Sequence, residues 1–177
     1  MAAAPQQHGS GTPASLGRGV RVEWSLEPGD TASVPELRHR IIRCLHRLAE
    51  PGSDLTDAEI VVGELLSNAM AHTTGPTWVS LRWDGVHPML SVADVGPGFL
   101  RAPMHDGGGL PAPGDDRTLR AALPRDPLAD GGRGLYLITT LAHDVAVAPR
   151  ATGGSVMSVT LDLRRAPGAT LRFGRRR

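Results

Sequence analysis

The stretch ELLSNAMAH, residues 64–72, places Glu64, Asn68 and His72 every four residues within an apolar run. Residues four apart on a helix share one face, so the run predicts a helix carrying a carboxylate, an amide and an imidazole in one column. A solvent-facing stripe is the simplest interpretation. However, the flanking residues leave little room for a polar face, and burying an unpaired polar group costs roughly 1–3 kcal/mol. The column therefore indicates either a narrow exposed stripe or a polar ligand above it.

Helices are predicted where apolar residues recur at helical spacing between start and stop signals. Thr56 and Glu59 match a capping box at the start of the helix that carries the column, and Ser33 is a plausible N-cap for an earlier helix. The three predicted helices span residues 33–50, 56–72 and 134–143.

Strands are predicted on both sides of these helices, and Asp84-Gly85 between the second and third strands is a hairpin signal. The five predicted strands span residues 20–26, 77–84, 88–95, 144–150 and 154–163. The element order favours a two-layer α/β (α+β) sandwich, with helices on one face of a mostly antiparallel mixed sheet. The other face of the sheet is expected to be partly open.

The domain limits follow from composition. Residues 1–19 consist largely of Ala, Pro, Gly, Ser and Gln and are predicted to be a disordered tail, and the folded domain is expected over residues 20–163. Between about 96 and 132 periodicity disappears in a segment rich in Gly, Pro and Asp, which is longer than an ordinary connection and is interpreted as a lid. Residues 164–177 are interpreted as an Arg-rich, basic C-terminal tail.

The composition excludes several kinds of chemistry. All 19 basic residues are arginine, so a P-loop lysine, the strand lysine of a protein-kinase fold and Schiff-base chemistry are excluded. A net charge of +1 argues against a globally basic nucleic-acid binder, although the C-terminal arginines leave contact with nucleic acid or an acidic partner as an alternative. Cys44 is the single cysteine, and we find no signal-peptide pattern and no long apolar run, so a cytoplasmic protein is expected.

Two further motifs carry chemistry. Asp94-Val-Gly-Pro-Gly98 follows an apolar strand, and one interpretation is an ordinary strand end. In the other, the Asp94 carboxylate accepts a hydrogen bond from an amino group of a ligand, and the glycines let that ligand approach the backbone. Gly131-Gly-Arg-Gly-Leu135 opens the last helix, where backbone N–H groups and the helix dipole favour phosphate. A hinge for the lid is the alternative reading, and it is compatible with phosphate binding.

The chain resembles the GHKL ATPases, whose fold is called the Bergerat fold. Three motifs carry the resemblance: Glu-x-x-x-Asn on a helix, Asp-x-Gly-x-Gly after a strand and Gly-x-Gly-Leu before a helix. The resemblance covers about residues 20–163. The compact chain looks most like the anti-sigma-factor serine/threonine kinase branch of that superfamily. The resemblance implies ATP and Mg²⁺ as cofactors.

The resemblance also implies a role for each matching residue. Glu64 would be the catalytic base, Asn68 would bind Mg²⁺ through its amide oxygen, and Asp94 would accept from the adenine amino group. For Thr160, a strand threonine with no binding role is the alternative, and His72 is expected to cap its helix. The remaining nucleotide-binding residues would be Gly96, Gly98, Gly132, Arg133, Gly134, Leu135 and Thr160.

The chain departs from the family pattern in its lid, which is long and has none of the lysines that some GHKL lids place on the γ-phosphate. An arginine of the lid is a possible substitute, but nothing in the sequence selects one. His46 lies inside the domain and no dimerisation hairpin precedes it, which argues against a phosphoacceptor histidine and a detached sensor kinase.

By resemblance, the expected function is a kinase and anti-sigma factor that phosphorylates an anti-anti-sigma partner of the STAS fold and holds a sigma factor. The alternative is a non-catalytic binding module, in which ATP orders the lid and the surface sequesters a sigma factor or another regulator. No direct contact with nucleic acid and no membrane association are expected. The resembled branch often forms homodimers, which makes a homodimer one option, but no surface in the sequence selects an oligomeric state.

Overall fold

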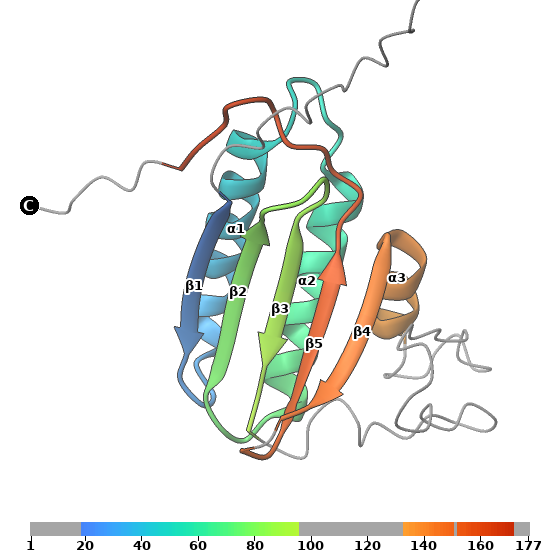
Figure 1. Ribbon diagram of the computed structural model, residues 1–177. Helices are drawn as coiled ribbons and strands as arrows, with labels where there is room; N and C mark the ends of the chain where they lie inside the picture. Colours follow the sequence, from blue (N-terminus) through green and yellow to red (C-terminus); the bar gives the residue numbers. More distant parts are fainter. Residues whose placement is uncertain (1–18, 96–132, 151, 172–177) are drawn as a thin grey trace, which may run out of the picture.

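The computed structural model describes residues 19–95, 133–150 and 152–171, which form a two-layer sandwich (Figure 1). One layer is a five-stranded sheet in the order β1-β2-β3-β5-β4, and every strand pair in it is antiparallel. The other layer consists of helices on one face of the sheet, as the sequence predicts. The strands are β1 (Val20–Leu26), β2 (Thr77–Trp83), β3 (Met89–Ala93), β4 (Asp144–Pro149) and β5 (Ser155–Thr160). The helices are the short 3-10 helix η1 (Thr31–Ser33), α1 (Val34–Leu48), α2 (Thr56–His72) and α3 (Arg133–Leu141).

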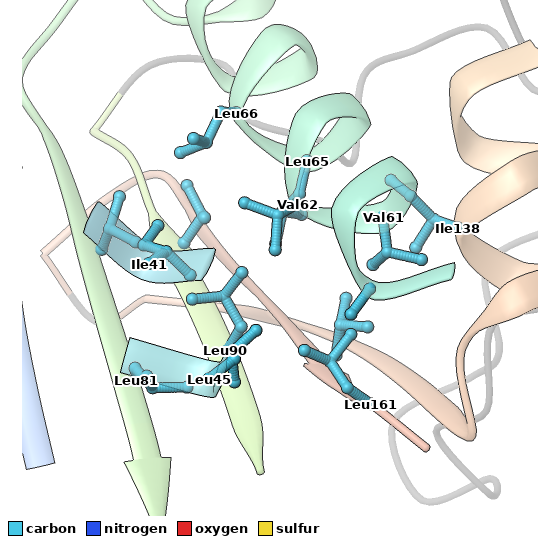
Figure 2. Close-up of a cluster of buried hydrophobic side chains, with 14 of the residues drawn as sticks. Ile41, Leu45, Val61, Val62, Leu65, Leu66, Leu81, Leu90, Ile138 and Leu161 are labelled. Atoms are coloured by element: carbon cyan, nitrogen blue, oxygen red, sulfur yellow. The ribbon is translucent and has the colours of Figure 1, made fainter. Parts of the chain in front are cut away.

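The core lies between the helices and one face of the sheet (Figure 2). On α1, a stripe at helical spacing is buried: Leu37, Ile41, Leu45 and Leu48. On α2 the buried side chains also form one stripe at helical spacing, and α2 contacts α1, α3 and β3. Ile138 of α3 points toward Val61 of α2 in Figure 2, which shows how α3 is attached to the helical layer.

The opposite face of the sheet is open, as expected. Alternate residues on adjacent strands are directly paired on this face, for example Glu23 with Ser80 and Ser80 with Ser91. Trp78 is 41% exposed there. A shallow hollow of about 410 Å³ lies over these strands.

The start of α2 differs from the prediction. Thr56 is the first helical residue rather than the N-cap, so the capping box is wrong. Instead, Asp54 Oδ1 accepts hydrogen bonds from the Thr56 backbone N–H at 2.9 Å and from its hydroxyl at 2.7 Å. Ser33 does precede α1, but its side chain makes no capping hydrogen bond, and Asp30 Oδ1 accepts from the Ser33 N–H.

The hairpin between β2 and β3 is confirmed, and its connection spans residues 84–88 rather than the 85–87 left between the predicted strands. Trp83 Nε1 donates to the Val86 carbonyl at 3.1 Å and fixes this loop on the end of β2. None of the helices in the described parts of the chain is both long enough and apolar enough to cross a bilayer.

The domain extends beyond the predicted boundary at residue 163. The backbone N–H of Ala166 donates to the Leu48 carbonyl at 2.8 Å, and the Glu50 N–H donates to the Arg164 carbonyl at 3.0 Å. The Arg165 guanidinium donates to the carbonyls of Trp83 at 3.1 Å and Ala169 at 2.6 Å. Residues 164–171 are therefore a C-terminal strap that joins the end of α1 to the end of β2, and not a free tail.

Candidate functional site

The polar column of α2 faces the beginning of α3. Glu64 and Asn68 are both half-buried, between fully buried neighbours such as Leu65 and Ala69. A Cβ built on Gly134 would lie 2.5 Å from Glu64 Oε2 and 3.2 Å from both the Nδ2 and the Oδ1 atoms of Asn68. The first and third sequence motifs are thus in direct contact, and any side chain at position 134 would displace the Glu64 carboxylate.

The helix α3 begins at Arg133, so its first turn lies beside the Glu64 carboxylate and the Asn68 amide. The first N–H groups of a helix have no partner within the helix, and the dipole adds partial positive charge there. Such an end binds phosphate readily. Arg133 is exposed and available to add a full positive charge, whereas Leu135 packs against the core and holds the helix in place. Gly132 lies outside the described residues.

Asp94 follows β3 and is 2% exposed. Its Oδ2 accepts a hydrogen bond from the Ser155 hydroxyl at 3.0 Å, and its backbone N–H donates to the Ser155 carbonyl at 3.0 Å. Its Oδ1 is buried and has no partner among the described residues. A buried acceptor without a donor is costly, so Oδ1 is suited to an amino group supplied by a ligand. Gly96 and Gly98, expected beside it, lie outside the described residues.

Ser155 is a site residue that the sequence analysis missed. The signal was Gly153-Gly154-Ser155 at the start of β5, since Gly154 has φ +81 and a Cβ on it would overlap the Asp94 carbonyl oxygen. Gly75, after α2, approaches Val95 equally closely, because its Cβ would overlap the valine side chain. Glycines therefore bring both the start of β5 and the loop after α2 against the end of β3.

Thr160 is not near Asp94, so the expectation that it contacts adenine is wrong. Antiparallel pairing sets Ser155 beside Asp94 and Thr160 beside Met89, at the other end of β3. At about 3.3 Å per residue, Thr160 lies roughly 16 Å from Ser155 along β5. Its side chain is on the open face of the sheet, where Ser91 pairs with Ser158. The alternative, a strand threonine with no binding role, is the one that agrees with the structure.

Asp94 and the start of α3 lie toward the same end of the sandwich, the lower end in Figure 1, and Gly134 joins α3 to the α2 column. His72 is the last residue of α2. The residues present fit a magnesium nucleotide: an unpaired buried carboxylate oxygen for an amino group, an amide oxygen for a hard cation, and a helix N-terminus for phosphates. The lid segment and its arginines lie outside the described residues.

Comparison with known proteins agrees with this fit. Residues 28–161 match the family model described as the histidine kinase-like ATPase domain, which is more than half of the chain. A search of curated proteins found no match.

Proposed function

Because the chain belongs to the histidine kinase-like ATPase family, within the GHKL superfamily, we propose that it is a Mg²⁺-ATP-dependent serine/threonine-protein kinase and anti-sigma factor. Domains of this family bind ATP. The proposed phosphoacceptor is a hydroxyl of an anti-anti-sigma protein of the STAS fold. Members of this family are typically anti-sigma-factor kinases, which supports the choice among GHKL activities.

The observation that carries the proposal is the position of Glu64 against the start of α3. The dipole of α3 stabilises a carboxylate at this end of the helix, but that carboxylate also repels phosphates bound there, so its presence favours a catalytic task. A general base must instead lie within hydrogen-bond reach of the attacking hydroxyl, close to the transferred group. The short distance of 2.5 Å from a Cβ built on Gly134 to Glu64 Oε2 supports this role, because it sets the carboxylate beside the first turn of α3.

Each residue of the site then has one task. Glu64 takes the proton of the attacking hydroxyl, and the Asn68 amide oxygen holds the cation. The unpaired Oδ1 of Asp94 accepts from the adenine amino group, and Ser155 fixes the carboxylate through Oδ2. The start of α3 orients the phosphates. Mg²⁺, when bound, neutralises the charge that develops on the transferred phosphoryl group.

The regulatory consequence follows from the acceptor. Phosphorylation adds about −1.5 to −2 charges to the partner surface that docked on the kinase, so the partner is released. The kinase surface is then free to hold a sigma factor. We place this activity in the cytoplasm, where both ATP and sigma factors are present.

The test is transfer of labelled phosphate from ATP to a purified STAS protein in the presence of Mg²⁺. Glu64→Gln should lower transfer by about 10²–10⁴-fold and leave nucleotide affinity nearly unchanged, because it removes the base and keeps the shape. Glu59→Gln, an exposed carboxylate on the same helix, is the matched control and should transfer normally. Equal transfer by Glu64→Gln and wild type would contradict the assignment of the base.

A second candidate is a non-catalytic module that sequesters a sigma factor or another regulator when ATP is bound. The observation that favours it is the absence of lysine from the whole chain, which removes the usual ammonium partner of a γ-phosphate. In that case partner capture would require ATP, wild type would transfer no phosphate, and Glu64→Gln would capture the partner as wild type does.

A further inference from the structure

Two histidines and an aspartate meet at the end of the sandwich opposite Asp94. The ligand atoms of His87, His143 and Asp162 all lie within 4.8 Å of one another. The two imidazole rings are stacked with centroids 4.6 Å apart. His87 Nδ1 lies 3.7 Å from Asp162 Oδ1. None of these residues belongs to the nucleotide site, because β5 separates the two groups by roughly 16 Å at about 3.3 Å per residue.

The backbone that carries the three residues is fixed by hydrogen bonds. The His143 N–H donates to the Thr160 carbonyl at 2.9 Å, and the Leu161 N–H donates to the Pro88 carbonyl at 2.9 Å. The three side chains come from different connections: the β2–β3 loop, the α3–β4 junction and the segment after β5. Their proximity is therefore a property of the tertiary fold and not of neighbouring residues in one flexible loop.

His87 has the support that a metal-binding histidine needs. Its Nδ1 lies 3.2 Å from the Leu163 carbonyl oxygen. With the proton on Nδ1, that nitrogen donates to the carbonyl, and Nε2 keeps a lone pair for a metal. A carbonyl behind one ring nitrogen is the usual way in which proteins orient a histidine ligand. The His87 side chain is 22% exposed, whereas that of Asp162 is 77% exposed and free to rotate toward an ion.

The surroundings attract cations. Asp162 also lines a groove of about 390 Å³, which contains the carboxylates of Glu50, Asp54 and Asp57 and one arginine, Arg164. Hydrogen bonds from the hydroxyl and N–H of Thr56 hold the pKa of Asp54 below its usual value, so that carboxylate stays ionised at neutral pH. A groove with an excess of one charge raises the local concentration of the opposite charge.

We propose that His87, His143 and Asp162 form a binding site for a divalent transition-metal ion, of which Zn²⁺ is the representative. Two imidazoles and one carboxylate are a ligand set that Zn²⁺ accepts, with water in the fourth position. Tetrahedral bonds of about 2.0–2.2 Å separate ligand atoms by about 3.3–3.6 Å, so ligand atoms that lie up to 4.8 Å apart must close in by up to about 1.5 Å. Bound metal then ties together the three connections at this end of the sheet.

The experiment is calorimetric titration of the untagged full chain with Zn²⁺ in the absence of nucleotide, since ATP itself binds metal. Wild type should bind one equivalent, and its melting temperature should rise by on the order of 5 °C with saturating Zn²⁺ and fall again with a chelator. Co²⁺ should give the intense visible absorption of a four-coordinate site, which reports ligand geometry without any variant.

The variants His87→Ala, His143→Ala and Asp162→Asn should each weaken Zn²⁺ binding at least tenfold while the circular dichroism spectrum is unchanged. The matched control is the double variant His39→Ala/His46→Ala, which removes two exposed histidines of α1 and should bind as wild type does. Equal affinity in the His87→Ala/His143→Ala double variant, or loss in the α1 control, would overturn the proposal. A wild-type Co²⁺ spectrum of the weak six-coordinate kind would also overturn it.

Discussion

The substitution Gly134→Ala tests the contact between α3 and the α2 column most directly. The added methyl group would lie 2.5 Å from Glu64 Oε2, whereas nonbonded carbon and oxygen atoms prefer about 3.5 Å. The carboxylate must therefore move by about 1 Å. Displacement of a catalytic group by that distance costs about 10²-fold in rate. We expect ATP turnover to fall by about that factor.

Folding should tolerate the same change. The atoms that the methyl group meets are the far ends of two side chains, which can rotate away. Gly134 lies within a helix and has no positive φ, so alanine fits its backbone, and alanine is more favourable than glycine in a helix by up to about 1 kcal/mol. The expected free energy of unfolding is therefore equal to wild type or up to about 1 kcal/mol higher.

The assay combines urea denaturation, calorimetric titration with Mg²⁺-ATP and single-turnover ATP consumption. Gly63→Ala is the matched control, since its methyl group would lie 3.6 Å from Arg38 Nε, an ordinary contact, and it gains the same helix propensity. Full activity in Gly134→Ala, or a loss of stability above about 2 kcal/mol, would refute the reasoning that a methyl group at position 134 displaces Glu64, the proposed base, without disturbing the fold.

Three further outcomes are expected. Asp94→Asn should weaken ATP binding, measured by calorimetry, by about 10–100-fold, because a hydrogen bond to a charged acceptor contributes about 1.5–3 kcal/mol. Unchanged affinity would contradict the assignment of Asp94 to the adenine amino group. Arg165→Ala should lower the free energy of unfolding, measured in urea, by about 1–3 kcal/mol, because it removes the hydrogen bonds to the Trp83 and Ala169 carbonyls that fix the C-terminal strap. The exposed Arg164→Ala is the control and should change that free energy by less than about 0.5 kcal/mol. Burial raises the pKa of the Cys44 thiol, against the lowering effect of three nearby arginines. Because the thiolate is the reacting form, the exchange of Cys44 with an aromatic disulfide at about pH 7.5 should be slower in the folded chain than in urea. Equal rates would contradict the raised pKa.

The positions of strands and helices could be predicted because their signals are local. The stripe from Leu37 to Leu48 recurs at helical spacing, and the strands alternate or are flanked by glycine and proline, so each element follows from its own residues. The start of α2 could not be predicted in the same way. Asp54 and Thr56 both offer a capping side chain two residues apart, and only the folded backbone decides which one accepts the N–H.

The errors in the site have a nonlocal cause. Which residue of β5 lies beside Asp94 depends on strand direction and register, and these follow from pairing with β3 rather than from the β5 sequence. The sequence therefore named Thr160 where the structure has Ser155. The C-terminal strap was missed for a similar reason, since its attachment includes backbone hydrogen bonds to Leu48 and Glu50 and a bond from Arg165 to Trp83, which composition does not reveal.

The open face of the sheet also gives the protein an intrinsic optical reporter. Arg150 donates to the Asp94 carbonyl at 2.8 Å, and its guanidinium carbon lies 4.8 Å from the centroid of the Trp78 ring. Trp83 is fully buried and Trp24 is half-buried, whereas Trp78 is exposed and contacts Arg150, so its emission should respond to a shift of that arginine. We therefore expect tryptophan fluorescence to report, without a label, the binding of a nucleotide at the proposed adenine site beside Asp94.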